Sequence, residues 1–277
     1  MSARRRLDDE LVRRKLAPSR TQARVDIAEG RVLVEGAPAG KPARLVHPGD
    51  AIVVVGEAPR FVSRAGAKLD AALDRFAVEV AGRRCLDAGA STGGFSDCLL
   101  QRGAAEVVAV DVGRGQLHER VANDPRVRVL DRTNVRELDL AAVGDPVDLV
   151  TADLSFISLR LVLDALLAVV RGDGDLVLLV KPQFEAGRQV VSKGRGIVSD
   201  PAVWADVLTE VASAIDARAA TMMGAMASPV TGSDGNVEFV VHVRPPGAAL
   251  PSPPPDAASM VSAAVAEAVA ALPGPGR

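Results

Sequence analysis

The sequence contains few of the residues that bind metals or cross-link a chain. Among its 277 residues are two cysteines and three histidines. Cys85 and Cys98 have no companions at the spacing of zinc ligands, so we expect no metal site and two reduced cysteines in the core of a cytoplasmic protein. No apolar run approaches the ~18 to 20 residues that a membrane-spanning helix needs. The charged start, Met-Ser-Ala-Arg-Arg-Arg, also lacks the apolar segment of a signal peptide.

Charge is distributed unevenly along the chain. Residues 1–60 contain 12 Lys and Arg against 8 Asp and Glu, whereas residues 61–277 contain 21 against 27. A basic first segment ahead of an acidic body predicts that contacts with nucleic acid are concentrated in that segment, although a solvated helix face would have the same charge pattern. The candidate RNA-binding residues are Arg4, Arg5, Arg6, Arg13, Arg14, Arg20, Arg24, Arg31 and Arg64.

Residues 85–95, Cys-Leu-Asp-Ala-Gly-Ala-Ser-Thr-Gly-Gly-Phe, have the layout of a strand, a tight turn and a helix. Glycine in such a turn lets backbone amides approach a ligand at the helix N-terminus. Asp111 ends the next apolar run, at the position where an acidic residue grips a ribose diol. Together these features predict a cofactor that contains adenosine.

The position of Asp87 distinguishes between two such cofactors. A carboxylate directly before the turn would repel the pyrophosphate of a dinucleotide, but it could pair with the ammonium group of S-adenosylmethionine. We therefore favour S-adenosylmethionine and keep a dinucleotide as the alternative. The sequence has no Gly-x-x-x-x-Gly-Lys-Ser/Thr motif, which argues against a nucleoside triphosphate.

The same turn also matches the nucleophile elbow of a hydrolase, Gly89-Ala-Ser91-Thr-Gly93. A hydrolase would need an acid and then a histidine later in the chain, and His242 lies inside an apolar run typical of a strand. We therefore interpret Ser91 as a turn or capping residue.

The apolar pattern predicts an α/β protein. Two short helices over 7–16 and 19–27, the second capped by Ser19, precede strands at 31–36 and 50–55. Strands at 84–87, 106–111, 127–130, 147–152 and 174–180 then alternate with helices at 94–102, 115–122 and 159–170. Such alternation favours a mostly parallel sheet. A helix after Asp200 and two apolar runs, 222–227 and 237–243, predict an antiparallel hairpin at one edge, as in Rossmann-like methyltransferases.

The expected organisation has four parts. A small α+β RNA-binding domain spans residues 1–56, a linker spans 57–61 and a methyltransferase domain spans 62–244. Residues 245–277 are expected to form a Pro- and Ala-rich tail with a short helix near 260–272.

Four charged residues lie at or near the ends of these expected elements: Lys68, Asp153, Lys181 and Glu238. Ligands of open parallel sheets bind at the carboxyl ends of the strands, so these side chains are expected to face one crevice with Asp87. A lysine at such a position can act as a base, although each charge can also simply mark the solvent end of a strand.

These residues resemble the Lys-Asp-Lys-Glu tetrad of the FtsJ/RrmJ-like ribose 2′-O-methyltransferases. The phrases around them are similar to the TlyA family: Val62-Ser-Arg-Ala-Gly-Ala-Lys-Leu69, Cys85 to Phe95, Asp111-Val-Gly, Asp131-Arg-Thr-Asn134, Ala152-Asp-Leu-Ser-Phe-Ile-Ser158, Val180-Lys-Pro-Gln-Phe-Glu185 and Gly235-Asn-Val-Glu-Phe239. The first 60 residues resemble the S4 RNA-binding domain of that family.

The resemblance implies a ribosomal RNA 2′-O-methyltransferase that acts on cytidine. The arginine-rich start and the C-terminal helix resemble the family form that modifies both 16S and 23S rRNA. The implied cofactor is S-adenosylmethionine, with no metal, and the implied cofactor-binding residues are Asp87, Gly89, Ala90, Ser91, Thr92, Gly93, Gly94, Phe95, Asp111, Val112, Asp131, Asn134 and Asp153.

The tetrad then receives individual roles. Lys181 is expected to act as the base or to steer the ribose hydroxyl, Asp153 to orient Lys181, and Glu238 to hold Lys68. The implied partner is ribosomal RNA or a ribosomal subunit, bound by a monomer.

Three alternatives remain open from the sequence. The first is a non-catalytic RNA-binding or ribosome-assembly factor, against which the intact tetrad argues. The second is a methyltransferase of small molecules, which the basic N-terminal segment disfavours. The third is a membrane-lytic protein, because the family has been given the name hemolysin; the absence of a spanning run makes this a poor physical interpretation.

Overall fold

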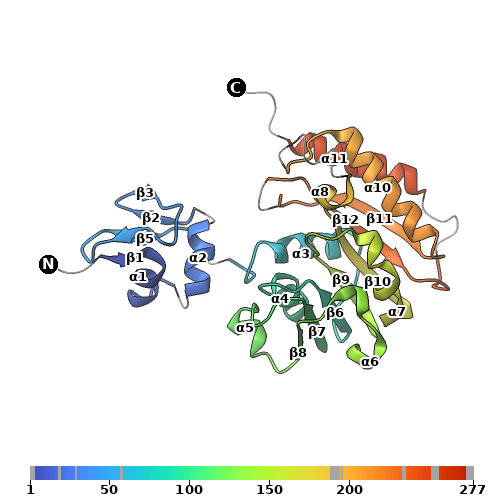
Figure 1. Ribbon diagram of the computed structural model, residues 1–277, viewed down its shortest axis with the longest axis horizontal. Coiled ribbons are helices and arrows are strands. Elements are labelled where there is room, and N and C mark those ends of the chain that lie inside the picture. The colour runs from blue at the N-terminus through green and yellow to red at the C-terminus, as the bar shows by residue number, and fades with distance from the viewer. Residues whose placement is uncertain are drawn as a thin grey trace. The chain divides into compact units, whose positions relative to one another are not determined.

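The computed structural model describes residues 4–17, 20–28, 30–56, 59–187, 194, 196–232, 235–250 and 256–272. The chain forms two compact units, residues 1–63 and 64–277, and Figure 1 labels most of their helices and strands. The first unit thus extends over the segment expected as a linker. Two residues of that segment, Glu57 and Ala58, lie outside the described residues, as does Ser19, the expected helix cap.

The N-terminal unit combines short helices with small antiparallel sheets. Its elements are β1 (Arg5–Arg6), α1 (Leu7–Arg13), α2 (Arg20–Ala28), β2 (Val32–Val34), β3 (Ala37–Pro38), β4 (Leu45–Val46) and β5 (Ile52–Val54). Strand β1 pairs with β4, and β2 pairs with both β3 and β5. Leu7, Leu11 and Ile27 of the helices are buried against Val32 and Val34. The sequence pattern predicted the helices and the two longer strands, whereas strands of two residues are too short to produce a periodic pattern.

Seven strands of the C-terminal unit form one sheet in the order β11-β12-β10-β9-β6-β7-β8. Their bounds are β6 (Arg84–Ala88), β7 (Glu106–Asp111), β8 (Val127–Asp131), β9 (Val147–Ala152), β10 (Val170–Val180), β11 (Thr221–Ala227) and β12 (Phe239–Arg244). The pairs from β8 to β10 are parallel. Strand β12 runs antiparallel to both β10 and β11. This topology confirms the Rossmann-like sheet with an antiparallel edge.

Helices alternate with the strands of the sheet, and the interior strand β10 is buried on both faces. The elements are α3 (Ala65–Arg75), α4 (Gly94–Gln101), α5 (Glu119–Ala122), η1 (Val135–Glu137), α6 (Leu140–Val143), η2 (Leu159–Leu161), α7 (Leu163–Val169), α8 (Pro182–Glu185), α10 (Pro201–Asp216) and α11 (Ala257–Ala271). Every residue from Leu176 to Val180 is buried. A strand buried on both faces has a continuous apolar run rather than an alternating one, which is the pattern in the sequence.

Two helices differ from the sequence expectation. The helix expected at 115–122 begins at Glu119, because residues 112–118 form a loop and His118 Nδ1 accepts the backbone N–H of Arg120 at 3.1 Å. The segment expected as one helix over 159–170 is divided into η2 and α7.

Helix α11 belongs to the core of the C-terminal unit rather than to a separate tail. Val261, Ala264 and Ala268 are buried in the same apolar cluster as the sheet. The backbone N–H of Ala227 in edge strand β11 donates to Glu267 Oε2 at 3.2 Å. The expected boundary at residue 245 is therefore not a boundary of packing. Within the described ranges, no helix combines the length and the apolar character needed to cross a bilayer.

Candidate active site

Lys181 and Asp153 meet where two neighbouring parallel strands end. Lys181 follows β10 and Asp153 follows β9, and Leu178 pairs with Ala152 between these strands. Lys181 Nζ lies 2.5 Å from Asp153 Oδ1 and donates to Ser155 Oγ at 3.1 Å. The sheet register therefore brings these two predicted residues together.

Lys68 and Glu238 form a second pair. Lys68 lies on α3 and Glu238 directly precedes β12, and their side chains make a direct ion pair. Both are buried, with 6% and 2% of their surface exposed. Val180 pairs with Phe239 on the antiparallel neighbour; Lys181 follows Val180 and Glu238 precedes Phe239, so both lie at the same end of the two strands. All four tetrad residues therefore gather at the end of the sheet where the parallel strands have their carboxyl ends.

A neighbouring glycine constrains the Glu238 carboxylate. A Cβ atom at Gly232 would lie 2.7 Å from Glu238 Oε1. The backbone N–H of Ser228 also donates to the Glu238 carbonyl at 2.8 Å. The loop between β11 and β12 thus sets the position of this side chain.

The turn after β6 needs its glycines. Gly89 has a φ of +84°, and a Cβ there would lie 2.5 Å from the carbonyl oxygen of Asp153. Gly93 has a φ of +90° and precedes the first residue of α4. Ser91, between them, also has a positive φ of +48°. The left-handed turn and the close approach to the β9 end explain why side chains larger than hydrogen are excluded at Gly89.

Asp87 is a fully buried carboxyl group in front of this turn. Its Oδ2 accepts the hydroxyl of Ser96 at 2.6 Å, whereas Oδ1 is buried without a hydrogen-bond partner in the described part of the chain. Burial raises the pKa of Asp87 to about 7, and the nearby carboxylates of Asp153 and Asp111 add to the increase. An unpartnered buried carboxylate oxygen suits a cationic ligand.

Asp111 and Asp131 end the next two strands in register. Asp111 accepts the backbone N–H of Ser91 at 2.7 Å and of Gly113 at 2.6 Å. Asp131 accepts the backbone N–H of Gly115 at 2.9 Å. The two carboxylates therefore hold the loops that border the turn.

The other predicted cofactor residues have different environments. Ala90, Gly94 and Phe95 are buried, and Val112 is 76% exposed. The Thr92 carbonyl accepts the backbone N–H of His118 at 3.1 Å. Asn134 caps η1 through its side chain, so its amide oxygen is engaged with the Arg136 backbone.

Two phenylalanines near Lys181 did not emerge as candidates from the sequence. Phe156 is 91% exposed with a φ of +64°, and its ring centroid lies 5.2 Å from that of Phe184. Lys181 Nζ lies 6.0 Å from the Phe184 centroid. Both residues occur in the phrases that resemble the TlyA family, but an apolar residue in a sequence gives no indication that it is exposed.

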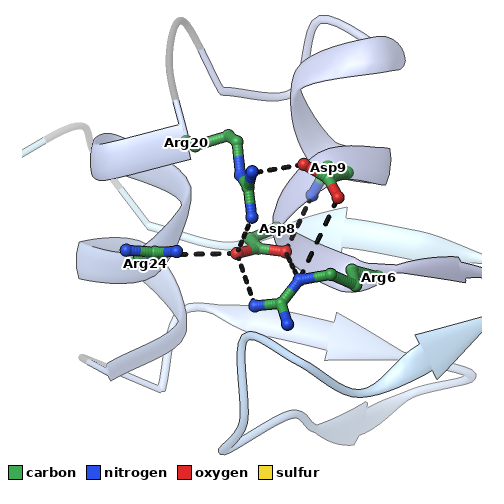
Figure 2. A network of polar contacts seen from close by, with 5 residues as sticks. All are labelled: Arg6, Asp8, Asp9, Arg20 and Arg24. Atoms are coloured by element: carbon green, nitrogen blue, oxygen red, sulfur yellow. Dashed lines mark hydrogen bonds and ion pairs between the residues drawn. The ribbon is translucent and has the colours of Figure 1, made fainter.

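The predicted RNA-binding arginines gather in two groups on buried carboxylates. Arg6, Arg20 and Arg24 surround Asp8, as Figure 2 shows. Arg13 and Arg14 both contact Glu10. The side chains of Asp8 and Glu10 have no exposed surface.

The remaining candidates lie apart from these groups. Arg4 donates to His47 Nε2 at 2.7 Å, and Arg5 is exposed on β1. Arg31 pairs with Asp26 at 2.8 Å and is mostly buried. Arg64 is exposed and belongs to the C-terminal unit, where it precedes α3.

The two cysteines and His242 are buried. Both cysteines are free and buried, and burial raises the pKa of the Cys85 thiol to about 12. His242 lies in β12 with Nε2 2.8 Å from Asp175. Among the described residues, no group of three or more His, Cys, Asp or Glu side chains is arranged to hold a metal ion.

Comparison with known proteins is consistent with this geometry. The FtsJ-like methyltransferase family matches residues 61–244, and the S4 domain matches residues 5–52. The chain is 53% identical over 245 residues to the 16S/23S rRNA (cytidine-2′-O)-methyltransferase TlyA of Mycobacterium tuberculosis, an alignment that covers 88% of this chain and 91% of that protein.

Two further relatives have the name hemolysin. Hemolysin A of Brachyspira hyodysenteriae is 36% identical, over 86% of this chain and 98% of that protein. A solved structure from Streptococcus thermophilus, also named as a hemolysin, has a TM-score of 0.73 and 35% identity over 98% of both chains. The chain therefore belongs to the TlyA family, in which an S4 domain precedes an FtsJ-like methyltransferase domain.

Proposed function

We propose that the protein transfers a methyl group from S-adenosylmethionine to the ribose 2′-oxygen of cytidine in 16S and 23S ribosomal RNA. The proposal rests on one observation. Two ion pairs, Lys181 with Asp153 and Lys68 with Glu238, lie at the same end of the sheet as the glycine turn. This end is where open parallel sheets bind ligands.

The residues of the turn fit this cofactor. Asp87 Oδ1, which has no hydrogen-bond partner among the described residues, suits the ammonium group of the methionine portion. Asp111, the last residue of β7, is placed to accept hydrogen bonds from a ribose diol. The exposed Val112 offers an apolar surface for the adenine ring. A dinucleotide fits less well, because Asp87 would repel its pyrophosphate.

When bound, S-adenosylmethionine supplies a methyl group already activated by the positive sulfur. The protein must then orient the 2′-hydroxyl and manage its proton. Asp153 fixes Lys181 by the 2.5 Å contact, and the Lys181 ammonium group orients the 2′-oxygen by donating a hydrogen bond to it. Lys181 acts as the base only as the neutral amine, after its own proton has passed to solvent; it then takes up the proton that leaves the 2′-oxygen. Glu238 fixes Lys68 at the other side of the tetrad.

The substrate class is supported by two features. Phe156 presents an exposed ring near Lys181, and such rings stack with bases that are turned out of RNA. The S4 unit supplies arginines that suit RNA phosphates. These features favour RNA over a small-molecule substrate.

Modification of both subunits is the finer part of the proposal. The relative from M. tuberculosis is named for both 16S and 23S rRNA, and its match extends over 91% of its length. The basic start of the present chain and its helix α11 also favour this form.

The proposal is tested with labelled S-adenosylmethionine and separately purified small and large ribosomal subunits that lack the modification. We expect the label on cytidine 2′-oxygens of both subunits. Lys181→Ala should lower the transfer rate by at least about 10²-fold while calorimetry shows unchanged cofactor binding. Arg171→Ala, on the same strand but at its start, is the control and should retain transfer.

The alternatives predict other outcomes. A non-catalytic assembly factor would bind subunits and cofactor without transferring label to either subunit. A membrane-lytic protein would release dye from liposomes, a result that would support the hemolysin name. Label on one subunit alone would restrict the substrate to that subunit.

A further inference from the structure

We infer that Asp8 is a positioning residue for RNA binding: its buried carboxylate holds Arg6, Arg20 and Arg24 in the arrangement that receives an RNA phosphate. The inference rests on the proposed RNA substrate. It assigns to an acidic residue, within a basic surface, a favourable effect on the binding of a polyanion.

The geometry that carries the inference is the convergence of three guanidinium groups from two elements on one carboxylate (Figure 2). Arg6 donates to Oδ1 at 2.9 Å through Nε and to Oδ2 at 3.0 Å through Nη2. Arg20 Nη2 and Arg24 Nε, both from α2, donate to Oδ2 at 3.1 and 3.3 Å. Arg20 is also held by Asp9, whose Oδ1 lies 2.8 Å from its Nε.

The carboxylate and the arginines that it holds differ in their exposure to solvent. The Asp8 side chain has no exposed surface, whereas the side chains of Arg6, Arg20 and Arg24 are 41%, 50% and 55% exposed. Asp8 is therefore hidden from a ligand, and the arginines are the groups that a ligand meets. Their hydrogen bonds, that of Arg6 first, hold the pKa of Asp8 well below its usual range, so the negative charge persists at neutral and mildly acidic pH.

The arginines keep donors for a phosphate. A guanidinium group has five N–H donors in a fixed fork. Arg24 contacts Asp8 through Nε, and in the described part of the chain its two amino groups have no protein acceptor. A phosphate can therefore bind to the amino groups while Asp8 retains Nε, in the bidentate manner typical of arginine.

Holding the side chains in advance favours binding. A free arginine loses much rotamer freedom when it binds a phosphate, and ordering three side chains beforehand removes part of that loss. The carboxylate also prevents three like charges from separating before the RNA arrives. The opposing effect is the long-range repulsion between Asp8 and RNA, which is reduced by the adjacent arginines.

These two effects predict opposite results for one substitution. Asp8→Asn raises the net charge by one unit, so charge alone predicts tighter RNA binding. Loss of the arrangement predicts weaker binding. We expect the full chain with Asp8→Asn to bind a 23S rRNA transcript about tenfold more weakly. Equal or tighter binding would overturn the inference.

Asp50→Asn is the matched control. It removes the same charge from the same unit, and its amide oxygen can still accept the His47 backbone hydrogen bond that Asp50 accepts at 2.9 Å. We expect this variant to bind RNA as tightly as the unchanged chain or slightly more tightly. Equal weakening by both substitutions would also contradict a specific role of Asp8.

A second variant covers the case in which Asp8→Asn disturbs the fold of the unit, which hydrogen exchange at α1 and α2 would reveal. Arg24→Lys keeps the charge at an exposed position but replaces the fork by a single ammonium group. We expect it to weaken binding several-fold; unchanged binding would show that charge alone matters and would refute the inference. If the unchanged chain itself fails to bind the transcript, the proposed function fails rather than the role of Asp8.

Discussion

Glu238 ion-pairs with Lys68 although 170 positions separate them in the sequence, and both side chains are buried. The pair links α3, ahead of the sheet, to the end of the loop before β12. Removing one partner of a buried ion pair leaves an uncompensated charge that strongly destabilises the folded protein, so each residue depends on the other.

Removal of one member should therefore affect both folding and catalysis. We expect Glu238→Ala to lower the free energy of unfolding by about 3 to 5 kcal/mol and to abolish methyl transfer. Chemical denaturation measures the first effect and labelled transfer the second.

The double change Lys68→Met with Glu238→Leu separates these effects. An apolar pair of similar volume should restore most of the stability but none of the transfer. Recovery of transfer in the double variant would show that the pair has only a structural role.

The buried Asp87 carboxyl group should make cofactor affinity and the stability of the fold depend on pH in opposite directions. Its pKa is about 7 in the folded protein and 3.8 as a free side chain, so the folded state holds the proton over that range. Stability from this group should therefore fall as the pH rises from about 4 to 7. Binding of the cationic cofactor needs the carboxylate and should strengthen from pH 6 to pH 8.

Asp87→Asn should remove both dependences. At pH 8 we expect a higher melting temperature without cofactor, and an affinity for S-adenosylmethionine that is weaker by about tenfold or more. Thermal melts and calorimetry at pH 6, 7 and 8 measure these effects. An affinity that remains pH-dependent in the variant would indicate that another group is responsible.

Gly232 predicts a defect in catalysis with little loss of stability. A Cβ there would lie 2.7 Å from Glu238 Oε1, at the far end of a side chain that can move aside. Gly232→Ala should turn the Glu238 carboxylate without breaking its contact with buried Lys68, and so lower the transfer rate while the melting temperature changes little. Gly172→Ala is the control, because a Cβ at that position has no neighbour within 4 Å.

Phe156 predicts a defect in substrate binding. Its ring is 91% exposed, so Phe156→Ala should leave the fold intact. Stacking of a base on an aromatic ring contributes about 1 to 3 kcal/mol, and we expect a loss of kcat/KM by about tenfold or more. Phe156→Trp should retain activity. Full activity of the alanine variant would contradict a contact between this ring and the nucleotide.

The fold was predictable because continuous apolar runs and turn glycines identify buried parallel strands. The same reasoning placed Asp153 and Lys181 at one edge, since the carboxyl ends of parallel strands lie together. The final hairpin followed from two apolar runs without an intervening helix.

Other features depend on contacts that a linear pattern does not contain. Asp8 was an ordinary charged residue in the sequence, and its burial beneath three arginines results from the packing of α1 on α2. Phe156 is an apolar residue in the sequence, yet its ring is 91% exposed and its backbone is left-handed. The Ala-rich C-terminal helix gave no indication of which surface it covers.

The strands of the sheet are synthesised in an order that differs from their order in space. This strand is the last of the sheet in sequence, yet it lies between β10 and β11. The glycine turn and Asp111 are synthesised more than 100 residues before Glu238. A growing chain can thus assemble the strands beside the glycine turn while Lys68 still lacks its carboxylate partner, and by the proposed role of the tetrad we expect methyl transfer only after Glu238 has been synthesised.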